Sequence, residues 1–451
     1  MDPLTQADMP PQLALVLCTI FVAFLLRLDH KQAPEVSRSS WIPTIWLLYI
    51  SSRALGSWFG TGGENIEAGS PMDQIFLIIL LCACLFVIFK RRVNLSQFAK
   101  ENSWLVVLIV YMLISILWSN MPGISFRRWM RELIAFVMYL QFFSERNPRL
   151  ALQSIIRRTI YILIPFSLLL IKYYPEYGVQ YGRWSGVSMW IGVALQKNGL
   201  AELCAISALF LIWTLIRRIR KRDVPVAEYQ TYMEVFVLGL ALYLLAGPQH
   251  SIAYSATATT ALIIGLLGFI SLYWMRKRRL VPHAKTLGLI IAIIFAYGTL
   301  TPFLGKLGLL DVSSLFGRTE TLTGRAEIWA TLIPFAFKRP VFGYGVGGFW
   351  TTAMRNLTSS HAHNGYLEVI LSLGIAGLVI ILLLYFAICR KAIRTMAVNF
   401  DWGVLFIAYV IVSLAHNVTE AGLESLVEPM AAIVFFLLVS SPPKFETSTV
   451  P

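Results

Sequence analysis

Apolar runs of roughly 15–22 residues recur along the whole chain, and each is long enough to form a helix across a membrane. The runs are continuous and do not alternate with polar positions, which indicates helices rather than the strands of a barrel. The pattern predicts an all-α, polytopic integral membrane protein with about 13 transmembrane helices. The predicted spans lie near residues 12–28, 41–59, 72–89, 103–118, 130–143, 155–172, 199–216, 231–247, 257–275, 286–303, 366–388, 403–418 and 427–440.

The composition supports a membrane protein and argues against a nucleic-acid partner. The 451 residues are 57% hydrophobic and 14% charged, with a mean hydropathy of +0.68. Soluble domains carry about 25% charged residues. The net charge of +14 comes from basic residues that cluster in short loops between spans, as the positive-inside rule requires. The five cysteines lie in apolar runs or at their ends, so no disulfide framework is expected.

The basic clusters fall in alternate loops, and a single topology satisfies all of them. The N-terminus is then outside and the C-terminus inside. One of these clusters comprises Arg146, Arg149, Arg157 and Arg158, which we place in a loop.

This topology leaves one large loop on the outer side. Its length is about 60 residues, against about 4–6 for a typical connection, and long loops on a rigid scaffold usually carry function. The expected segments are an N-terminal transmembrane bundle at 1–303, the large loop at 304–365, C-terminal transmembrane helices at 366–440 and a disordered tail at 441–451.

Two of the six histidines, His361 and His363, lie where the large loop meets the next predicted span. Because histidine exchanges a proton near neutral pH, the pair indicates proton-transfer chemistry at the boundary between water and membrane. Each histidine has a structural alternative, His363 as a capping or packing residue and His361 as an exposed residue. Asn364 has one too, since it could serve only as a helix cap. Glu420, near the outer end of the following span, either orients a histidine or closes a helix.

Several cationic residues lie in segments predicted to face outward, against the positive-inside bias. Arg183, Arg318 and Arg325 are the main examples, and Lys197 stands beside Asn198 where a span begins. A guanidinium group binds phosphate through two parallel hydrogen bonds and stays charged, so these arginines indicate a phosphate-bearing substrate. The alternative for each is an interfacial residue that pairs with a lipid headgroup or a nearby carboxylate.

Other chemistries find little support in the sequence. The run 343–348 formally matches GxGxxG, but no strand precedes it, so it predicts a bend rather than a dinucleotide site. The aspartates are scattered, whereas divalent-metal glycosyl or phosphoryl transfer usually needs clustered carboxylates. No phosphate-binding P-loop and no HExxH motif occur.

Over roughly residues 105–435 the chain resembles the O-antigen ligase and Wzy-type polysaccharide polymerase family, particularly its exopolysaccharide polymerases. The resemblance rests on short motifs in combination. These are His363-Asn364 followed after nine residues by Gly374 and then Gly377, Gly324-Arg325 with Trp329, Arg339 through Gly345 with Phe349-Trp350, Trp184 with Gly186, and Lys197-Asn198-Gly199-Leu200. The chain has about one more predicted span than the 12 typical of the ligases.

The resemblance implies a GT-C-like fold in a bacterial inner membrane, with the N-terminus periplasmic, the C-terminus cytoplasmic and the active site facing the periplasm. Such enzymes transfer a glycan from undecaprenyl diphosphate to an acceptor hydroxyl, with inversion and without a metal or other cofactor. The acceptor is the growing polysaccharide or lipid A–core. Membrane lipids surround the enzyme, and a flippase and a chain-length regulator are further expected partners.

The resemblance also implies roles for particular residues. His363 would activate the acceptor hydroxyl, and Arg325 would act with it in catalysis by holding the diphosphate together with Arg183. The further substrate-binding residues implied are Lys197, Asn198, Arg318, His361, Asn364 and Glu368. Polymerisation is the favoured activity and ligation of O-antigen is the near alternative. A transporter of lipid-linked glycans or small anions is an alternative of another class, although transporters usually place charge near the membrane midplane.

Overall fold

The structure, a computed structural model, describes residues 9–60, 70–182, 186–220, 228–248, 255–280, 283–306, 320–358 and 361–440, without the side chains of 305, 306 and 320–324. Arg183, Arg318 and the predicted tail lie outside these residues. The described residues are 79% helical. Within the described ranges its strands are β1 (Val179–Tyr181) and β2 (Ser188–Trp190), which pair as one antiparallel hairpin. The all-α prediction is therefore confirmed apart from this hairpin.

Eight helices in the described part of the chain are long and apolar enough to cross a membrane. A ninth span is formed if the bent pair Leu95–Glu101 and Ser103–Trp118 is taken as one. A polytopic membrane protein is thus confirmed, but the predicted number of about 13 is not. Three predicted spans correspond to shorter helices, α2 (Trp41–Ile50), α17 (Phe400–His416) and α18 (Pro429–Val439), because hydropathy does not show where an apolar segment turns.

Contacts divide the chain into two units. The first comprises Met1–Gly63, Ser70–Arg91 and Gln141–Leu266, and the second Glu64–Gly69, Arg92–Leu140 and Leu267–Pro451. The predicted segments follow sequence order alone, and that division stays a prediction.

The elements of the first unit are α1 (Pro11–Gln32), η1 (Arg38–Ser40), α2, α3 (Leu55–Trp58), α4 (Pro71–Arg91), α8 (Pro148–Tyr173), α9 (Pro175–Gly178), β1, β2, α10 (Lys197–Arg220), α11 (Glu228–Ala246) and the start of α12 (Ala256–Lys277). The second unit holds α5 (Leu95–Glu101), α6 (Ser103–Ser115), η2 (Ile116–Trp118), most of α7 (Pro122–Phe143), the end of α12, α13 (Ala284–Lys306), α14 (Glu320–Lys338), α15 (Thr352–Leu357), α16 (Gly365–Val398), α17 and α18.

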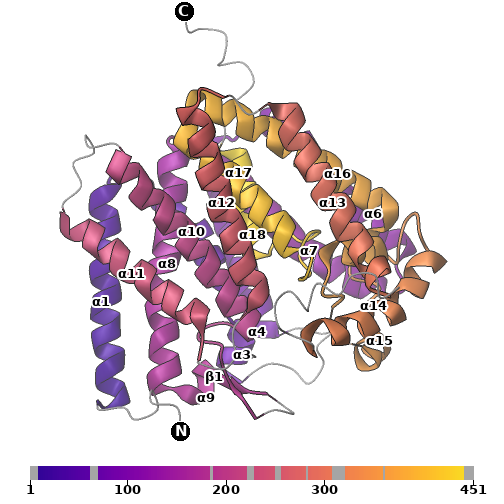
Figure 1. Ribbon diagram of the computed structural model, residues 1–451, viewed down its shortest axis with the longest axis horizontal. Helices are drawn as coiled ribbons and strands as arrows, with labels where there is room; N and C mark the ends of the chain where they lie inside the picture. Colours follow the sequence, from indigo (N-terminus) through magenta and orange to yellow (C-terminus); the bar gives the residue numbers. More distant parts are fainter. Residues whose placement is uncertain are drawn as a thin grey trace, which may run out of the picture. The chain divides into compact units, whose positions relative to one another are not determined.

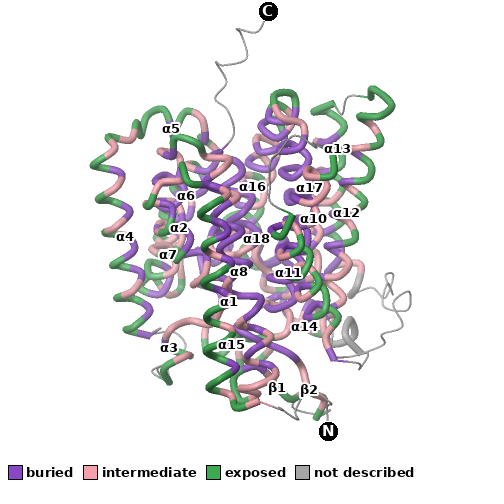
Figure 2. The backbone as a smooth tube through the Cα atoms, turned by 90° about the vertical axis from the view of Figure 1, so that its left-hand side faces the viewer, coloured by how far each residue is buried: buried purple, intermediate pink, exposed green. Residues whose placement is uncertain are grey.

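Helices α8 and α10 form the buried centre of the first unit, whereas α1 and α4 carry many exposed residues (Figure 2). The exposed side chains of α4 are large and apolar, with Ile75 and Ile78 more than half exposed and Phe89 77% exposed. In water such a surface would be polar. An apolar outer face instead fits contact with lipid, which agrees with the assignment of α4 as a membrane span.

Two arginines that the sequence analysis placed in a loop lie inside helix α8 and are buried. Arg157 donates to Asp29 at 2.9 Å and Arg158 donates to the other oxygen of the same carboxylate at 2.6 Å. Glu234 of α11 lies 3.6 Å from Arg157 and 2.6 Å from Arg218. The loop placement was wrong because hydropathy counts each charge separately, whereas buried charges become tolerable once they are paired and hydrogen-bonded.

Helix α16 is central to the second unit, where it packs against α6, α13, α14 and α17 (Figure 1). The segment predicted to be a large loop contains two helices, α14 and α15. A hydrophobic cluster joins α14 and the segment after it to α16, and its buried members include Trp329, Leu332, Ile333, Phe349, Trp350, Ala362, Leu367, Ile370 and Leu371. This packing holds the histidine segment at the start of α16 in place.

Helix α16 is interrupted at Gly374, which has φ 70° and ψ −172°. The backbone groups freed by this break bond to the bend at 340–344, where Ile375 donates to Pro340 at 2.8 Å and Tyr344 donates to Leu371 at 2.9 Å. Gly343, Gly345 and Gly347 have φ between 61° and 82°, so the glycine-rich run is a bend, as predicted. Gly374 therefore makes a close backbone contact with this bend.

Replacing Gly374 by alanine is expected to destabilise the protein by about 1–3 kcal/mol, because an L side chain is strained at this φ and the new methyl group would meet the Val341 carbonyl. Thermal unfolding of the purified protein in detergent measures the effect. Gly268→Ala is the matched control, since a Cβ at this helical position has no neighbour within 4 Å. Equal stability of the two variants would contradict the expectation.

Candidate active site

Two hydrogen bonds to the backbone of Ala362 hold the histidine segment in place. Trp329 of α14 donates to the Ala362 carbonyl at 2.9 Å, and Glu368 of α16 accepts from the Ala362 N–H at 2.8 Å. The two histidine rings on either side have centroids 4.0 Å apart. His363 has a φ of 50°, a left-handed conformation that non-glycine residues rarely adopt. The backbone at His363 is thus held in an energetically unfavourable conformation, and the two imidazole rings lie side by side.

Asn364 is fully buried and caps helix α16. Its Oδ1 accepts from the backbone N–H of Leu367 at 2.8 Å. Its Nδ2 donates to the carbonyls of Gly298 and Val418, at 3.0 and 2.9 Å. These contacts give Asn364 a positioning role, which is the alternative that its sequence context allowed. A contact with substrate stays a prediction.

Glu420, in the segment between α17 and α18, contacts both catalytic candidates, Arg325 and His363. Its Oε1 accepts from Arg325 Nη2 at 3.1 Å, and its Oε2 lies 3.8 Å from His363 Nδ1, within ion-pair range but beyond hydrogen-bond distance. The side chains of Arg325 and His363 remain 16% and 23% exposed, so both can be reached by a bound molecule. A base, a cation and a shared carboxylate therefore meet in one partly buried site.

Burial and neighbouring charges shift the pKa values of two ionisable groups of the site, His361 and Glu420. Burial, together with the charge of His363, lowers the pKa of His361 to about 4, so His361 is neutral at physiological pH. Burial alone would raise the pKa of Glu420, but contact with His363 and the charge of Arg325 hold it below its usual value. Glu420 is therefore ionised at neutral pH.

Two further carboxylates, Glu368 and Glu424, form hydrogen bonds near the start of α16. Glu368 accepts from Trp350 Nε1 in addition to Ala362, and Glu424 accepts from the Ser372 hydroxyl. Burial and the nearby charge of Glu368 raise the pKa of Glu424 to about 8. Glu368 thus holds the loop that carries the histidines, while its predicted contact with substrate stays a prediction.

Three groups of the site also have the chemistry of metal ligands. One ligand atom each of His361, His363 and Glu420 lie within 4.8 Å of one another. Imidazole nitrogens with a carboxylate suit zinc or another transition metal. Against this use, one oxygen of Glu420 already accepts from the cationic Arg325. The arrangement thus calls for a chelation test.

The structure brings together some of the predicted site residues and not others. His361, His363, Asn364, Glu368 and Arg325 all lie in the second unit, around the start of α16. Lys197 and Asn198 begin α10 in the first unit, where both are half-buried and have partners. Arg183 and Arg318 lie outside the described residues.

Sequence reasoning missed the partners that position the site. It did not identify Glu424, nor the contact of Trp350 with Glu368. Arg128 donates to the Gly347 carbonyl at 2.6 Å and so fixes the glycine-rich bend. One signal was available, because Glu420, Glu424 and Glu428 recur every four residues in a short segment between two apolar helices.

Comparison with known proteins gives two matches for this chain. The model of the O-antigen ligase family matches residues 250–382, which include both histidines and Arg325 but not Glu420. The chain is also 23% identical to the exopolysaccharide production protein ExoQ of Rhizobium meliloti. Residues 250–382 of this chain are thus similar to an O-antigen ligase domain. The predicted resemblance to O-antigen ligases and polysaccharide polymerases is therefore confirmed.

The similarity to the exopolysaccharide production protein extends beyond the ligase domain. It covers 322 residues, which are 65% of this chain and 66% of that protein, just under two thirds of its length. Both matches are to names from polysaccharide biosynthesis, an O-antigen ligase family and an exopolysaccharide production protein.

Proposed function

We propose that this protein transfers a glycan from an undecaprenyl-diphosphate carrier to an acceptor hydroxyl, and that it polymerises the repeat units of a secreted polysaccharide. The observation that carries the proposal is the meeting of His363 and Arg325 at Glu420. A base beside a guanidinium group at the edge of a membrane protein suits a reaction in which a hydroxyl is deprotonated and a diphosphate departs.

In this reaction the acceptor oxygen attacks the anomeric carbon, and the bond from that carbon to the diphosphate oxygen breaks with inversion. His363 Nε2 takes the hydroxyl proton, while its Nδ1 faces Glu420, which stabilises the resulting imidazolium. The diphosphate leaves with the bonding electrons, and Arg325 stabilises the charge that develops on it. Preplaced donors of this kind are most effective where water is excluded.

Polymerisation and ligation differ in the acceptor alone. The similarity to a protein named for exopolysaccharide production favours polymerisation, and the match to the O-antigen ligase family favours ligation to lipid A–core. The two resemblances share the carrier and the proposed chemistry. We further propose a bacterial inner membrane location, with the N-terminus and active site on the periplasmic side, the C-terminus in the cytoplasm, and a flippase and a chain-length regulator as partners.

The direct test uses purified protein, a short undecaprenyl-diphosphate-linked glycan and no added acceptor, with products resolved by size. We expect a ladder of longer lipid-linked glycans. Transfer that occurs only after lipid A–core is supplied would replace the polymerase assignment with a ligase. Absence of both products, with movement of the lipid-linked glycan across vesicles, would favour the transporter alternative.

EDTA is expected to leave the initial rate of transfer unchanged, because Arg325 supplies the positive charge that a divalent metal would otherwise provide. The rate is measured before and after chelation, with elemental analysis of the protein as a parallel readout. Loss of activity that zinc or magnesium restores would contradict the metal-free mechanism and assign the metal to His361, His363 and Glu420.

A further inference from the structure

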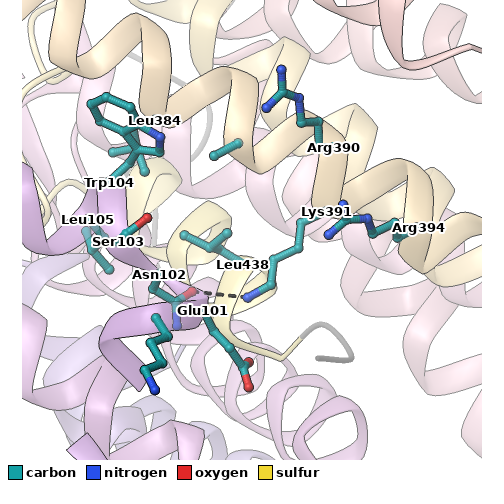
Figure 3. Close-up of a pocket in the computed structure, with 12 residues that line it drawn as sticks. Glu101, Asn102, Ser103, Trp104, Leu105, Leu384, Arg390, Lys391, Arg394 and Leu438 are labelled. Atoms are coloured by element: carbon teal, nitrogen blue, oxygen red, sulfur yellow. Dashed lines mark hydrogen bonds between the residues drawn. The ribbon is translucent and has the colours of Figure 1, made fainter. Parts of the chain in front are cut away.

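A polar pocket lies in the second unit (Figure 3). It adjoins the C-terminal half of α16, whereas His361 and His363 precede the first residue of that helix. It is formed by α5, the start of α6, the C-terminal half of α16 and Leu438 at the end of α18. Its volume is about 150 Å³, roughly ten times the 10–15 Å³ that one water molecule needs. The pocket thus has room for a ligand larger than water.

The pocket is strongly cationic on one side. Helix α16 contributes Arg390, Lys391 and Arg394, and α5 contributes Lys100. Lys391 is buried and donates to Asn102 Oδ1 at 3.1 Å (Figure 3). Arg390 and Arg394 are exposed, and neither has an ion pair within the described residues. Four cations around one cavity favour a phosphate as the group that the pocket binds.

The backbone around the pocket adds to this preference for an anion. Helices α5 and α6 meet at Asn102 with a bend of 98°. Ser103 and Trp104, the first residues of α6, line the pocket, and their backbone N–H groups have no partner within the helix. A helix N-terminus carries partial positive charge, which here adds to the cationic side chains.

One carboxylate distinguishes the pocket from a simple phosphate site. Glu101 Oε1 accepts from Gln97 Nε2 at 2.9 Å. Its Oε2 is buried and has no hydrogen-bond partner within the described residues. A buried carboxylate oxygen without a partner is costly, and a ligand with a hydrogen-bond donor would satisfy it. The complementary ligand therefore joins a phosphate to an ammonium group.

The position of the pocket indicates where such a ligand comes from. The apolar part of α16 ends at Cys389, so Arg390, Lys391 and Arg394 lie at the depth of lipid headgroups. Leu105, Leu384 and Leu438 line the pocket beside its polar groups. Basic pockets between membrane helices are known binding places for lipid headgroups. A free phosphate compound would need no such apolar wall.

We propose that this pocket binds the headgroup of a phosphatidylethanolamine-type phospholipid, with its phosphate on Arg390, Lys391 and Arg394 and its ammonium group on Glu101. The site is distinct from the catalytic candidates, and the proposal does not depend on the proposed function. The headgroup stabilises the bend between α5 and α6 against the end of α16.

The test is native mass spectrometry of the delipidated full-length protein, titrated with phosphatidylethanolamine or phosphatidylcholine. Both lipids carry the phosphate, but the trimethylammonium group of phosphatidylcholine has no N–H to donate. We expect phosphatidylethanolamine to bind about tenfold more tightly, as one charge-assisted hydrogen bond allows. Equal binding of the two lipids, or equal binding of soluble phosphoethanolamine, would overturn the proposal.

Two variants locate the site. Arg390→Ala with Arg394→Ala is expected to weaken binding of both lipids by about tenfold or more. Lys277→Ala with Arg278→Ala removes the same charge from the exposed end of α12 and is expected to leave binding unchanged. Glu101→Gln is expected to abolish only the preference for phosphatidylethanolamine. Unchanged binding in the α16 variant, an equal loss in the α12 control, or a retained preference in Glu101→Gln would each refute the assignment. Thermal unfolding of every variant verifies that it is folded.

Discussion

Replacing His363 by alanine is expected to lower the rate of glycan transfer by about 10²–10⁴-fold, the usual contribution of a positioned general base. The imidazole stands at a partly exposed site with Glu420 3.8 Å from its Nδ1. An alanine leaves no group to take the proton of the acceptor hydroxyl. The initial rate with purified enzyme and lipid-linked glycan measures the loss.

His363→Asn accompanies this variant, because asparagine tolerates the left-handed backbone conformation of residue 363 and supplies no base near neutral pH. His283→Ala is the matched control, an exposed histidine at the start of α13. Both His363 variants should unfold at temperatures close to that of the parent protein. Transfer at the parent rate in either would remove His363 from the mechanism.

Arg325→Lys is expected to lower the transfer rate by about 10²–10³-fold, in the range observed when one donor to a developing negative charge is removed. Lysine keeps the charge but not the planar fork that binds a diphosphate through two hydrogen bonds. The rate is measured as for His363. Arg278→Lys, at the exposed end of α12, is the matched control.

A double variant distinguishes catalysis from a purely structural role of Arg325. If Arg325 served only to neutralise Glu420, then Arg325→Gln combined with Glu420→Gln would transfer glycan at the rate of Glu420→Gln alone. If Arg325 stabilises the departing diphosphate, the double variant is slower than Glu420→Gln alone. Equal rates of the double variant and Glu420→Gln would therefore assign Arg325 to the fold and not to the reaction.

Much of the candidate site could be predicted from the sequence, because its residues depart from their surroundings. His361 and His363 stand out in an apolar chain, and Arg325 stands out on the predicted outer side. The partners were harder to predict. Arg325 and Glu420 are 95 residues apart, and the contact of Trp350 with Glu368 depends on how the glycine-rich bend packs against α16.

Some sequence patterns were misleading for a physical reason. Arg157 and Arg158 indicated a loop because an unpaired charge is costly within a membrane. The structure places them inside α8, where Asp29 and Glu234 neutralise them. The sequence left Asn364 open between a helix cap and a contact with substrate, and the structure shows its side-chain amide bonded to Leu367, Gly298 and Val418, while the contact with substrate stays a prediction. In both cases the deciding partner belongs to a distant part of the chain.

The sequence by itself determined that this is a helical membrane protein with polar residues gathered at the ends of its spans. Hydropathy is a local property that sums along a segment, so it needs no knowledge of neighbours. Only the tertiary structure decided that His363 and Arg325 share Glu420, and that Gly374 interrupts α16 to meet the bend at 340–344. Such contacts join residues far apart in the chain, and their geometry is set by packing rather than by composition.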